Sequence, residues 1–130
     1  MKNNSYRSNN NLLIKVKKNV NWKPIEDLLK QLKKNKSSAG VKSYLPIKMF
    51  KILLLQTWYN FSDRAIEEFL SDSISFRIFV GFNIEEKTPN HTTICRFRNN
   101  LFKKRLTEEI FKIINSQLET AGLIKKRFNN

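Results

Sequence analysis

The chain of 130 residues has only one cysteine, Cys95, and only one histidine, His91. A single cysteine forms no disulfide within a chain, which is typical of a protein in a reducing cytoplasm. Protein zinc sites need three or four ligands, and no further His or Cys exists to complete a set with these two. As a nucleophile, Cys95 has no support beyond His91. The pattern therefore favours neither a metal site nor a nucleophile, and Cys95 is expected to be a small buried residue.

Glycine and proline are also scarce, at three residues each. An all-β fold needs frequent turns and so more of both residues, which makes all-α the expected class. Long apolar runs are missing too: the longest cluster, LPIKMFKILLLQTWYNF at 45–61, includes two lysines and a glutamine. It falls short of a membrane span. We expect a soluble, cytoplasmic protein, associated with the nucleoid and without a membrane partner.

Acidic residues are few: 11 Asp and Glu stand against 25 Lys and Arg, for a net charge of +14. A small domain with this balance is expected to bind a polyanion, because neutralised phosphates release their counterions. Charge alone does not choose between nucleic acid and an anionic membrane surface. Nucleic acid is favoured because no single strongly amphipathic basic helix dominates the sequence.

Apolar spacing and capping residues predict one all-α domain, a compact bundle of about five to six short helices that includes a helix-turn-helix-like unit. Residues 1–20 are expected to be a flexible basic tail, 21–125 the helical domain and 126–130 a C-terminal tail. The helix at 46–60 is apolar nearly all round and should form the centre of the core. The other helices are expected at 24–35, 62–70, 72–81 and 107–121, with a connector at 36–45. Their capping candidates are Ser62 or Asp63, Asp72 and Thr107, and their terminators are Gly81 and Gly122.

The segment TPNHTTICRFRNNL, residues 88–101, predicts a helix with two different faces. Asn90 or Thr92 can cap it, and Ile94, Phe97 and Leu101 fall on one side. The opposite side holds Thr92, Arg96, Asn99, Asn100 and Lys103. Arg can bind guanine, Asn can bind adenine and Thr can hold a phosphate, as a helix-turn-helix reader requires. An ordinary solvated helix face explains the same periodicity equally well. Arg98 lies near the apolar side and is expected to pair with a carboxylate at the core edge.

Three stretches carry a resemblance to a known family: WKPIEDLLKQL, then LPIKMFKILLLQTWYNFSDRAIEEFLSDSISFRIFVGF, then TPNHTTICRFRNNL. Together they resemble the N-terminal domain of InsH-type transposases of the insertion sequence 5 group, over roughly 21–125. The resemblance implies an all-helical domain that binds double-stranded DNA at the element's terminal inverted repeats. Asn90 stands where the family usually has Asp, and Cys95 where it has a small residue, commonly Ser. By motif position, His91, Thr92, Thr93, Arg96 and Arg98 match the family's most recognisable segment. The predicted DNA-binding residues are His91, Thr92, Thr93, Arg96, Asn99, Asn100 and Lys103.

The resemblance also implies a second domain of RNase H type, whose three carboxylates bind Mg²⁺ for strand cleavage and transfer. This chain ends about where the family's first catalytic strand begins. Its own acids fall mostly in the first turns of expected helices or on solvated faces. We therefore expect no catalytic residue, metal or cofactor in this chain, and a truncated or frameshifted gene copy that does not cut DNA alone. A downstream reading frame that supplied the catalytic half would restore an enzyme.

A different function remains open, that of an interaction module. The expected last helix carries an apolar stripe that could pair with another chain, giving a homodimer or a mixed dimer with full-length transposase. The stripe consists of Ile110, Ile113, Ile114 and Leu118.

Overall fold

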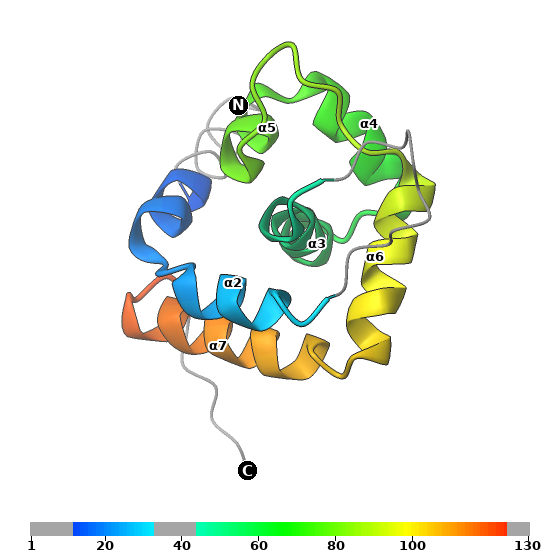
Figure 1. The fold of residues 1–130 in the computed structure, drawn as a ribbon. Coiled ribbons are helices and arrows are strands. Elements are labelled where there is room, and N and C mark those ends of the chain that lie inside the picture. The colour runs from blue at the N-terminus through cyan, green and yellow to red at the C-terminus, as the bar shows by residue number, and fades with distance from the viewer. Residues whose placement is uncertain (1–11, 33–43, 125–130) are drawn as a thin grey trace.

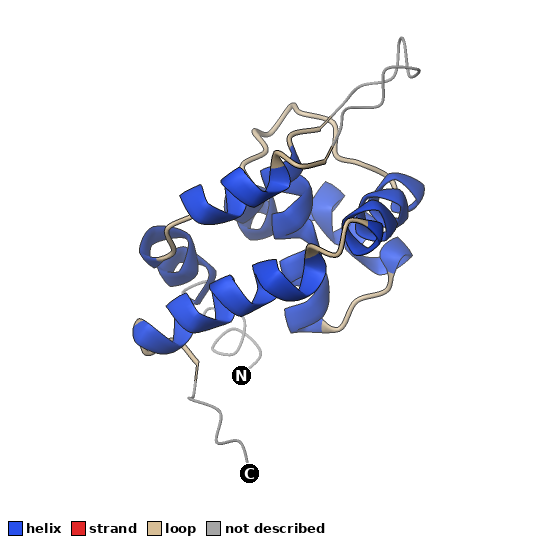
Figure 2. Cartoon of the chain, turned by 60° about the horizontal axis from the view of Figure 1, so that its bottom comes forward, coloured by secondary structure: helices blue, strands red, loops and turns tan. Residues whose placement is uncertain are grey.

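The computed structural model describes residues 12–32 and 44–124, and within these ranges it contains helices and no strand (Figure 2). The all-α prediction is therefore confirmed. The predicted C-terminal tail at 126–130, residues 1–11 of the predicted N-terminal tail and residues 36–43 of the predicted connector lie outside the described residues. None of the described helices is both long and apolar enough to cross a membrane.

Helix α3, Pro46–Tyr59, is the centre of the fold. Pro46 suits the first turn, where its missing N–H has no partner to lose. Asn60 ends the helix in the left-handed conformation, at φ 56°. Figure 1 looks along the axis of α3 and shows the other helices around it. Phe50 and the leucines 54 and 55 are completely buried, as the nearly all-apolar sequence predicts.

The remaining labelled helices surround α3 as paired elements. Helices α2 and α7 pack against each other, as do α4 and α6, while α2, α4, α5 and α6 all contact α3. Their bounds are Lys23–Leu29 for α2, Asp63–Asp72 for α4, Ile74–Val80 for α5, His91–Lys103 for α6 and Thr107–Thr120 for α7.

The predicted N-terminal tail is wrong for residues 12–20. Residues 12–19 form a helix that precedes α2, and Leu13, Val16 and Val20 are buried in the core. These three apolar residues recur at helical spacing, so one stripe of an otherwise polar segment can pack on the bundle. The prediction gave too much weight to the lysines and asparagines between them.

Helix ends show which local signals were read correctly. Ser62 caps α4 by accepting from the Ala65 N–H at 3.1 Å, and Gly81 ends α5 at φ 104°. The cap of α5, however, is Ser73 and not Asp72: the Ser73 hydroxyl accepts from the Phe76 N–H at 3.2 Å.

Two other predicted ends are also wrong. Thr107 does not cap α7, because Leu106 holds that position and the Thr107 hydroxyl is buried without a partner among the described residues. Helix α2 ends at Leu29, six residues before the predicted end. The amides of Gln31 and Leu32 bond three residues back instead of four, in a tighter turn.

Arg77 makes the largest number of hydrogen bonds among the described side chains that hold the connection from α5 to α6. Its guanidinium donates to the carbonyls of Leu70, Asn83, Ile84 and Glu86, at 2.6–3.0 Å. Residues 81–90 thus leave α5 along a fixed course before α6 begins. A helix-turn-helix uses a turn of about three or four residues. The α5–α6 connection is much longer than that. The structure therefore does not support the prediction that α6 is the second helix of a helix-turn-helix-like unit.

Candidate nucleic-acid interface

The N-terminal end of α6 is capped from two sides. The Asn90 side chain accepts from the Thr93 N–H at 2.9 Å, so Asn90 is the cap of the two predicted candidates, Asn90 and Thr92. From α4, the Glu67 carboxylate accepts from the His91 N–H at 2.6 Å and lies 2.7 Å from His91 Nδ1. These contacts with His91 lower the pKa of Glu67. A negative charge at this position also complements the positive end of the helix dipole.

About two turns further along α6, Arg98 is bound to α4 as well. Its two terminal nitrogens donate to the two carboxylate oxygens of Asp63, each at 2.8 Å. Gln56 of α3 completes the group: it accepts from Arg98 at 3.2 Å and donates to Asp63 at 2.5 Å. The hydrogen bonds from Arg98 lower the pKa of Asp63 and, in return, raise that of Arg98. The prediction that Arg98 pairs with a carboxylate at the core edge is confirmed.

The inward face of α6 is apolar, as predicted. Ile94 and Leu101 are completely buried, and Phe97 packs against the core from a half-buried position. Together with the two contacts to α4, this packing fixes both the position and the rotation of the helix.

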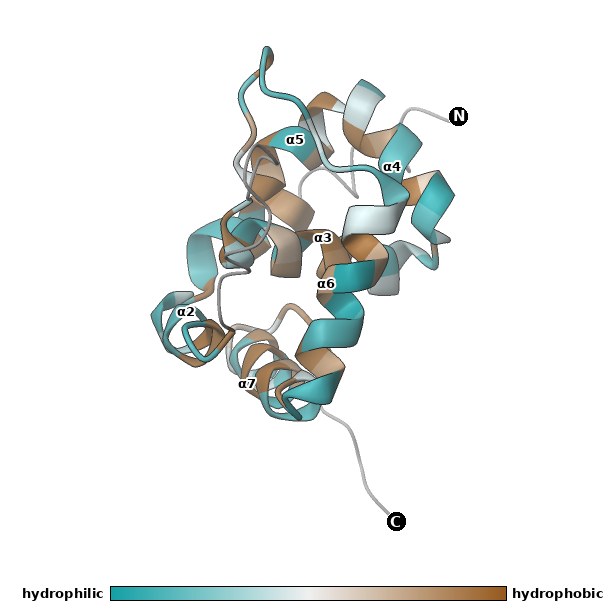
Figure 3. Cartoon of the chain, turned by 45° about the vertical axis from the view of Figure 1, so that its right-hand side comes forward, coloured by the Kyte–Doolittle hydropathy of each residue, from teal (hydrophilic) through white to brown (hydrophobic). Residues whose placement is uncertain are grey.

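The outward face carries most of the predicted DNA-binding residues. Figure 3 shows hydrophilic residues alternating with hydrophobic ones along α6. Thr92, Arg96, Asn99 and Lys103 are exposed, whereas Thr93 and Asn100 are half-buried. No hydrogen bond or ion pair to another described residue holds Arg96. His91 differs from the rest because its ring is engaged by Glu67.

The charge of this surface is uniformly positive along α6. Residues 91–105 contain five Lys and Arg residues and no carboxylate. Of these cations, Arg98 is neutralised by Asp63, while Arg96, Lys103, Lys104 and Arg105 are exposed. Solvated cations without partners can bind an anion at little cost, because no internal contact has to break first.

Glu67 is a functional neighbour that sequence reasoning missed. It lies on the predicted helix at 62–70, but nothing in its spacing shows that it reaches the first turn of α6, 24 residues away in sequence. Cys95 is half-buried and free, so the prediction of a buried residue holds only in part; the amide nitrogen of Asn99 lies 3.7 Å from its sulfur. Within residues 12–32 and 44–124, no group of three His, Cys, Asp or Glu could hold a metal ion.

The chain matches the family model for a transposase domain, DUF772, over residues 2–100. It belongs to this family. The match includes α2 to α5 and α6 as far as Asn100. Thr92, Arg96 and Asn99 therefore lie within the matched residues, and Lys103 lies after them. No solved structure matches the chain.

The apolar stripe of α7 has a role inside the fold. Ile110 and Ile114 are completely buried, Leu118 is 1% exposed and Ile113 packs partly buried against the same core. Helix α7 uses this stripe to pack against α2. The fold itself covers the stripe, so it is not the free pairing surface that the sequence predicted. Dimerisation of the chain through another surface stays a prediction.

Proposed function

We propose that this transposase domain binds double-stranded DNA with the outward face of α6. The observation that carries the proposal is the combination of exposed donors on that face with the absence of any carboxylate from 91 to 105. The net charge of +14 supports it, because binding of a basic domain to duplex DNA is driven by counterion release.

Each residue type on this face suits one part of a duplex. Arg96 can bind the O6 and N7 atoms of guanine in a bidentate manner, and Asn99 can do the same with adenine N6 and N7. Lys103 and Thr92 are suited to bind phosphate oxygens. Such contacts position a protein on DNA but do not depend on the DNA sequence. The resemblance of the sequence to InsH-type transposases, together with its match to the transposase-domain family, leads us to propose the terminal inverted repeats of an insertion sequence 5 group element as the target.

The contacts between α4 and α6 explain why this helix could read a groove. A recognition helix must be held at a fixed angle, since small displacements break bidentate contacts with bases. Glu67 holds the first turn of α6 and Asp63 holds its third. Both carboxylates lie on the side of α6 that faces α4, so they anchor the helix without crossing the outward face.

A binding assay with three duplexes tests the proposal: the element's end, the same end with shuffled sequence, and unrelated DNA. Arg96→Ala should weaken binding to the element's end by about 1–3 kcal/mol if its guanidinium contacts a guanine, and much less on the other two duplexes. Lys112→Ala, which removes one exposed cation from α7, is the matched control and should change binding little.

Two results would count against this function. Equal affinity for the three duplexes would mean that the domain does not recognise the element's end. An equal loss from Arg96→Ala and from Lys112→Ala would mean that α6 has no special role.

A catalytic centre outside this chain, with Mg²⁺ bound by an RNase H-type carboxylate triad, is also a proposal. Sequencing the DNA beyond the codon for Asn130 tests it directly. An open frame with an Asp-bearing strand would support this catalytic centre, and the absence of such a frame would count against it.

A further inference from the structure

Phe102 is the most exposed aromatic residue among those described. It is 74% exposed, and it has no ring contact with another described aromatic residue. Phe69, the other exposed phenylalanine, differs because its ring stacks on Phe61 at a centroid distance of 4.4 Å. A single exposed apolar side chain is common on protein surfaces. Phe102 is of interest because exposed cations follow it directly in the chain.

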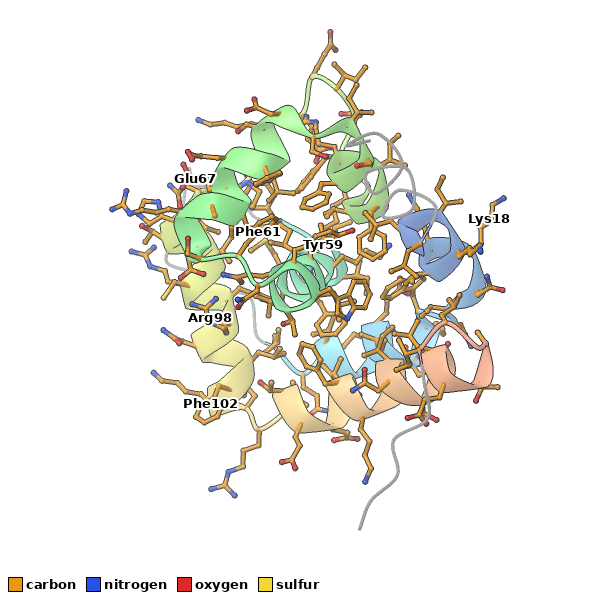
Figure 4. All side chains as sticks on the ribbon, turned by 180° about the vertical axis from the view of Figure 1, so that it is seen from behind. Lys18, Tyr59, Phe61, Glu67, Arg98 and Phe102 are labelled. Carbon is orange, nitrogen blue, oxygen red and sulfur yellow. The ribbon has the colours of Figure 1, made fainter. Side chains whose placement is uncertain are left out.

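The position of Phe102 follows from where α4 begins. His91 and Arg98 lie on the side of α6 that faces α4, and Phe102 continues that side one turn beyond Arg98. Helix α4 starts at Asp63, the partner of Arg98, and therefore does not extend over Phe102. Figure 4 shows Phe102 at the opposite end of α6 from Glu67, with Arg98 between them.

The surroundings of Phe102 are strongly cationic. Lys103, Lys104 and Arg105 follow it directly, and all three are exposed. Arg105 adopts the left-handed conformation, at φ 58°, where the chain turns into α7. A shallow hollow of about 670 Å³ is lined by Phe102, Lys103, Arg105, Thr107 and Glu108. Glu108 is the one acid on its wall.

We propose that Phe102 stacks on a nucleobase at the end of the DNA segment bound by α6. An aromatic ring beside cations is the combination that holds a base by its face and the flanking phosphates by charge. The base could come from a base step opened by the ring or from an unpaired nucleotide; the chemistry of the contact is the same. This inference rests on the proposed function and adds a residue that acts by stacking.

The test compares Phe102→Ala with the wild-type domain, on an intact duplex from the element's end and on the same duplex with one unpaired base. Loss of stacking should weaken binding about fivefold or more on at least one of them. Phe102→Trp should keep the affinity, and its added tryptophan fluorescence should be quenched by DNA. The matched control is Ile84→Ala, which removes an exposed apolar side chain, 85% exposed, from the loop before α6 and should bind as the wild type does.

Salt dependence separates stacking from charge. Phe102→Ala should leave the slope of log K against log salt concentration unchanged, whereas Lys103→Ala should reduce it by about one. Glu108→Gln, which removes the acid beside the ring, should strengthen binding. If Phe102→Ala loses affinity only for the duplex with the unpaired base, that base is the stacking partner. If it loses affinity equally for both duplexes, the partner is a base of an opened base step.

Equal binding of Phe102→Ala and wild type on both duplexes would overturn the inference while leaving the proposed function intact. A wild-type domain that binds neither duplex would overturn both. Because Phe102 lies outside the core, both Phe102 variants should unfold at the same urea concentration as the wild type, so a folding defect does not obscure the result.

Discussion

Breaking the bidentate pair between Arg98 and Asp63 should loosen α6 from α4, and a double-mutant cycle can measure by how much. The cycle consists of Arg98→Met, Asp63→Asn and the double variant. Arg98→Met leaves Asp63 without its cation, and Asp63→Asn leaves Arg98 without its anion and with one acceptor oxygen instead of two. Each single change should therefore destabilise the domain more than the pair itself is worth. The coupling energy isolates the interaction between the two side chains.

The magnitude follows from geometry and exposure. A hydrogen bond to a charged group contributes about 1.5–3 kcal/mol, and this pair has two, both at 2.8 Å. The Arg98 side chain is 38% exposed and that of Asp63 25% exposed. Fully exposed ion pairs contribute only about 0.2–1 kcal/mol, because water screens them and the side chains lose freedom. We therefore expect a coupling energy of about 1–2 kcal/mol.

Urea unfolding followed by far-ultraviolet circular dichroism provides the four free energies of unfolding that the cycle needs. Lys112→Ala is the control for loss of one exposed cation without a salt-bridge partner among the described residues. A coupling energy below about 0.3 kcal/mol would refute the reasoning, since the pair would then not fix α6. If the pair does fix α6, the double variant should also bind duplex DNA more weakly, although neither residue lies on the outward face.

Three further changes test other parts of the structure. Burial, aided by Lys17 and Lys48, lowers the pKa of Lys51 to about 8. Lys51→Met should therefore raise the free energy of unfolding at pH 7 by about 1–2 kcal/mol, despite the lost contact with the Trp22 ring at 4.6 Å. That gain in stability should shrink as the pH rises above about 8, because the wild type then folds with a neutral Lys51 amine. Urea titrations at several pH values measure the gain. A gain that stays constant with pH would contradict the prediction. Asp63 and Glu67 have lowered pKa values in the folded state, so their stabilisation is present at neutral pH and lost as the pH falls below about 4. On acidification, the free energy of unfolding should fall less in Asp63→Asn than in the wild type. Identical curves for the two proteins would exclude Asp63 as a contributor to the pH dependence of stability. Asn90→Ala removes the α6 cap and should cost about 1 kcal/mol in the same urea assay, whereas Asn90→Asp should restore or exceed the wild-type value.

Sequence alone predicted the elements whose signals are local. The nearly all-apolar α3, the caps Ser62 and Asn90 and the terminator Gly81 are each decided by a few neighbouring residues. The two faces of α6 followed from helical spacing for the same reason. Even Arg98 was correctly assigned to a carboxylate, because its angle around the helix placed it beside the apolar stripe.

The failures all depend on distant parts of the chain. Residues 12–20 looked like a polar tail because only the bundle gives Leu13, Val16 and Val20 a surface to cover. The stripe of α7 looked free because its partner, α2, lies far away in sequence. Glu67 could not be linked to His91 from spacing, since that contact requires α4 and α6 to lie side by side.

Backbone amide chemical shifts, measured while a duplex from the element's end is added, test the central claim most directly. The account predicts the largest changes at Thr92, Arg96, Asn99 and Lys103 on the outward face of α6, with small changes along α7 around Lys112. Changes centred on α7 or on the helix at 12–19, with α6 unaffected, would contradict it.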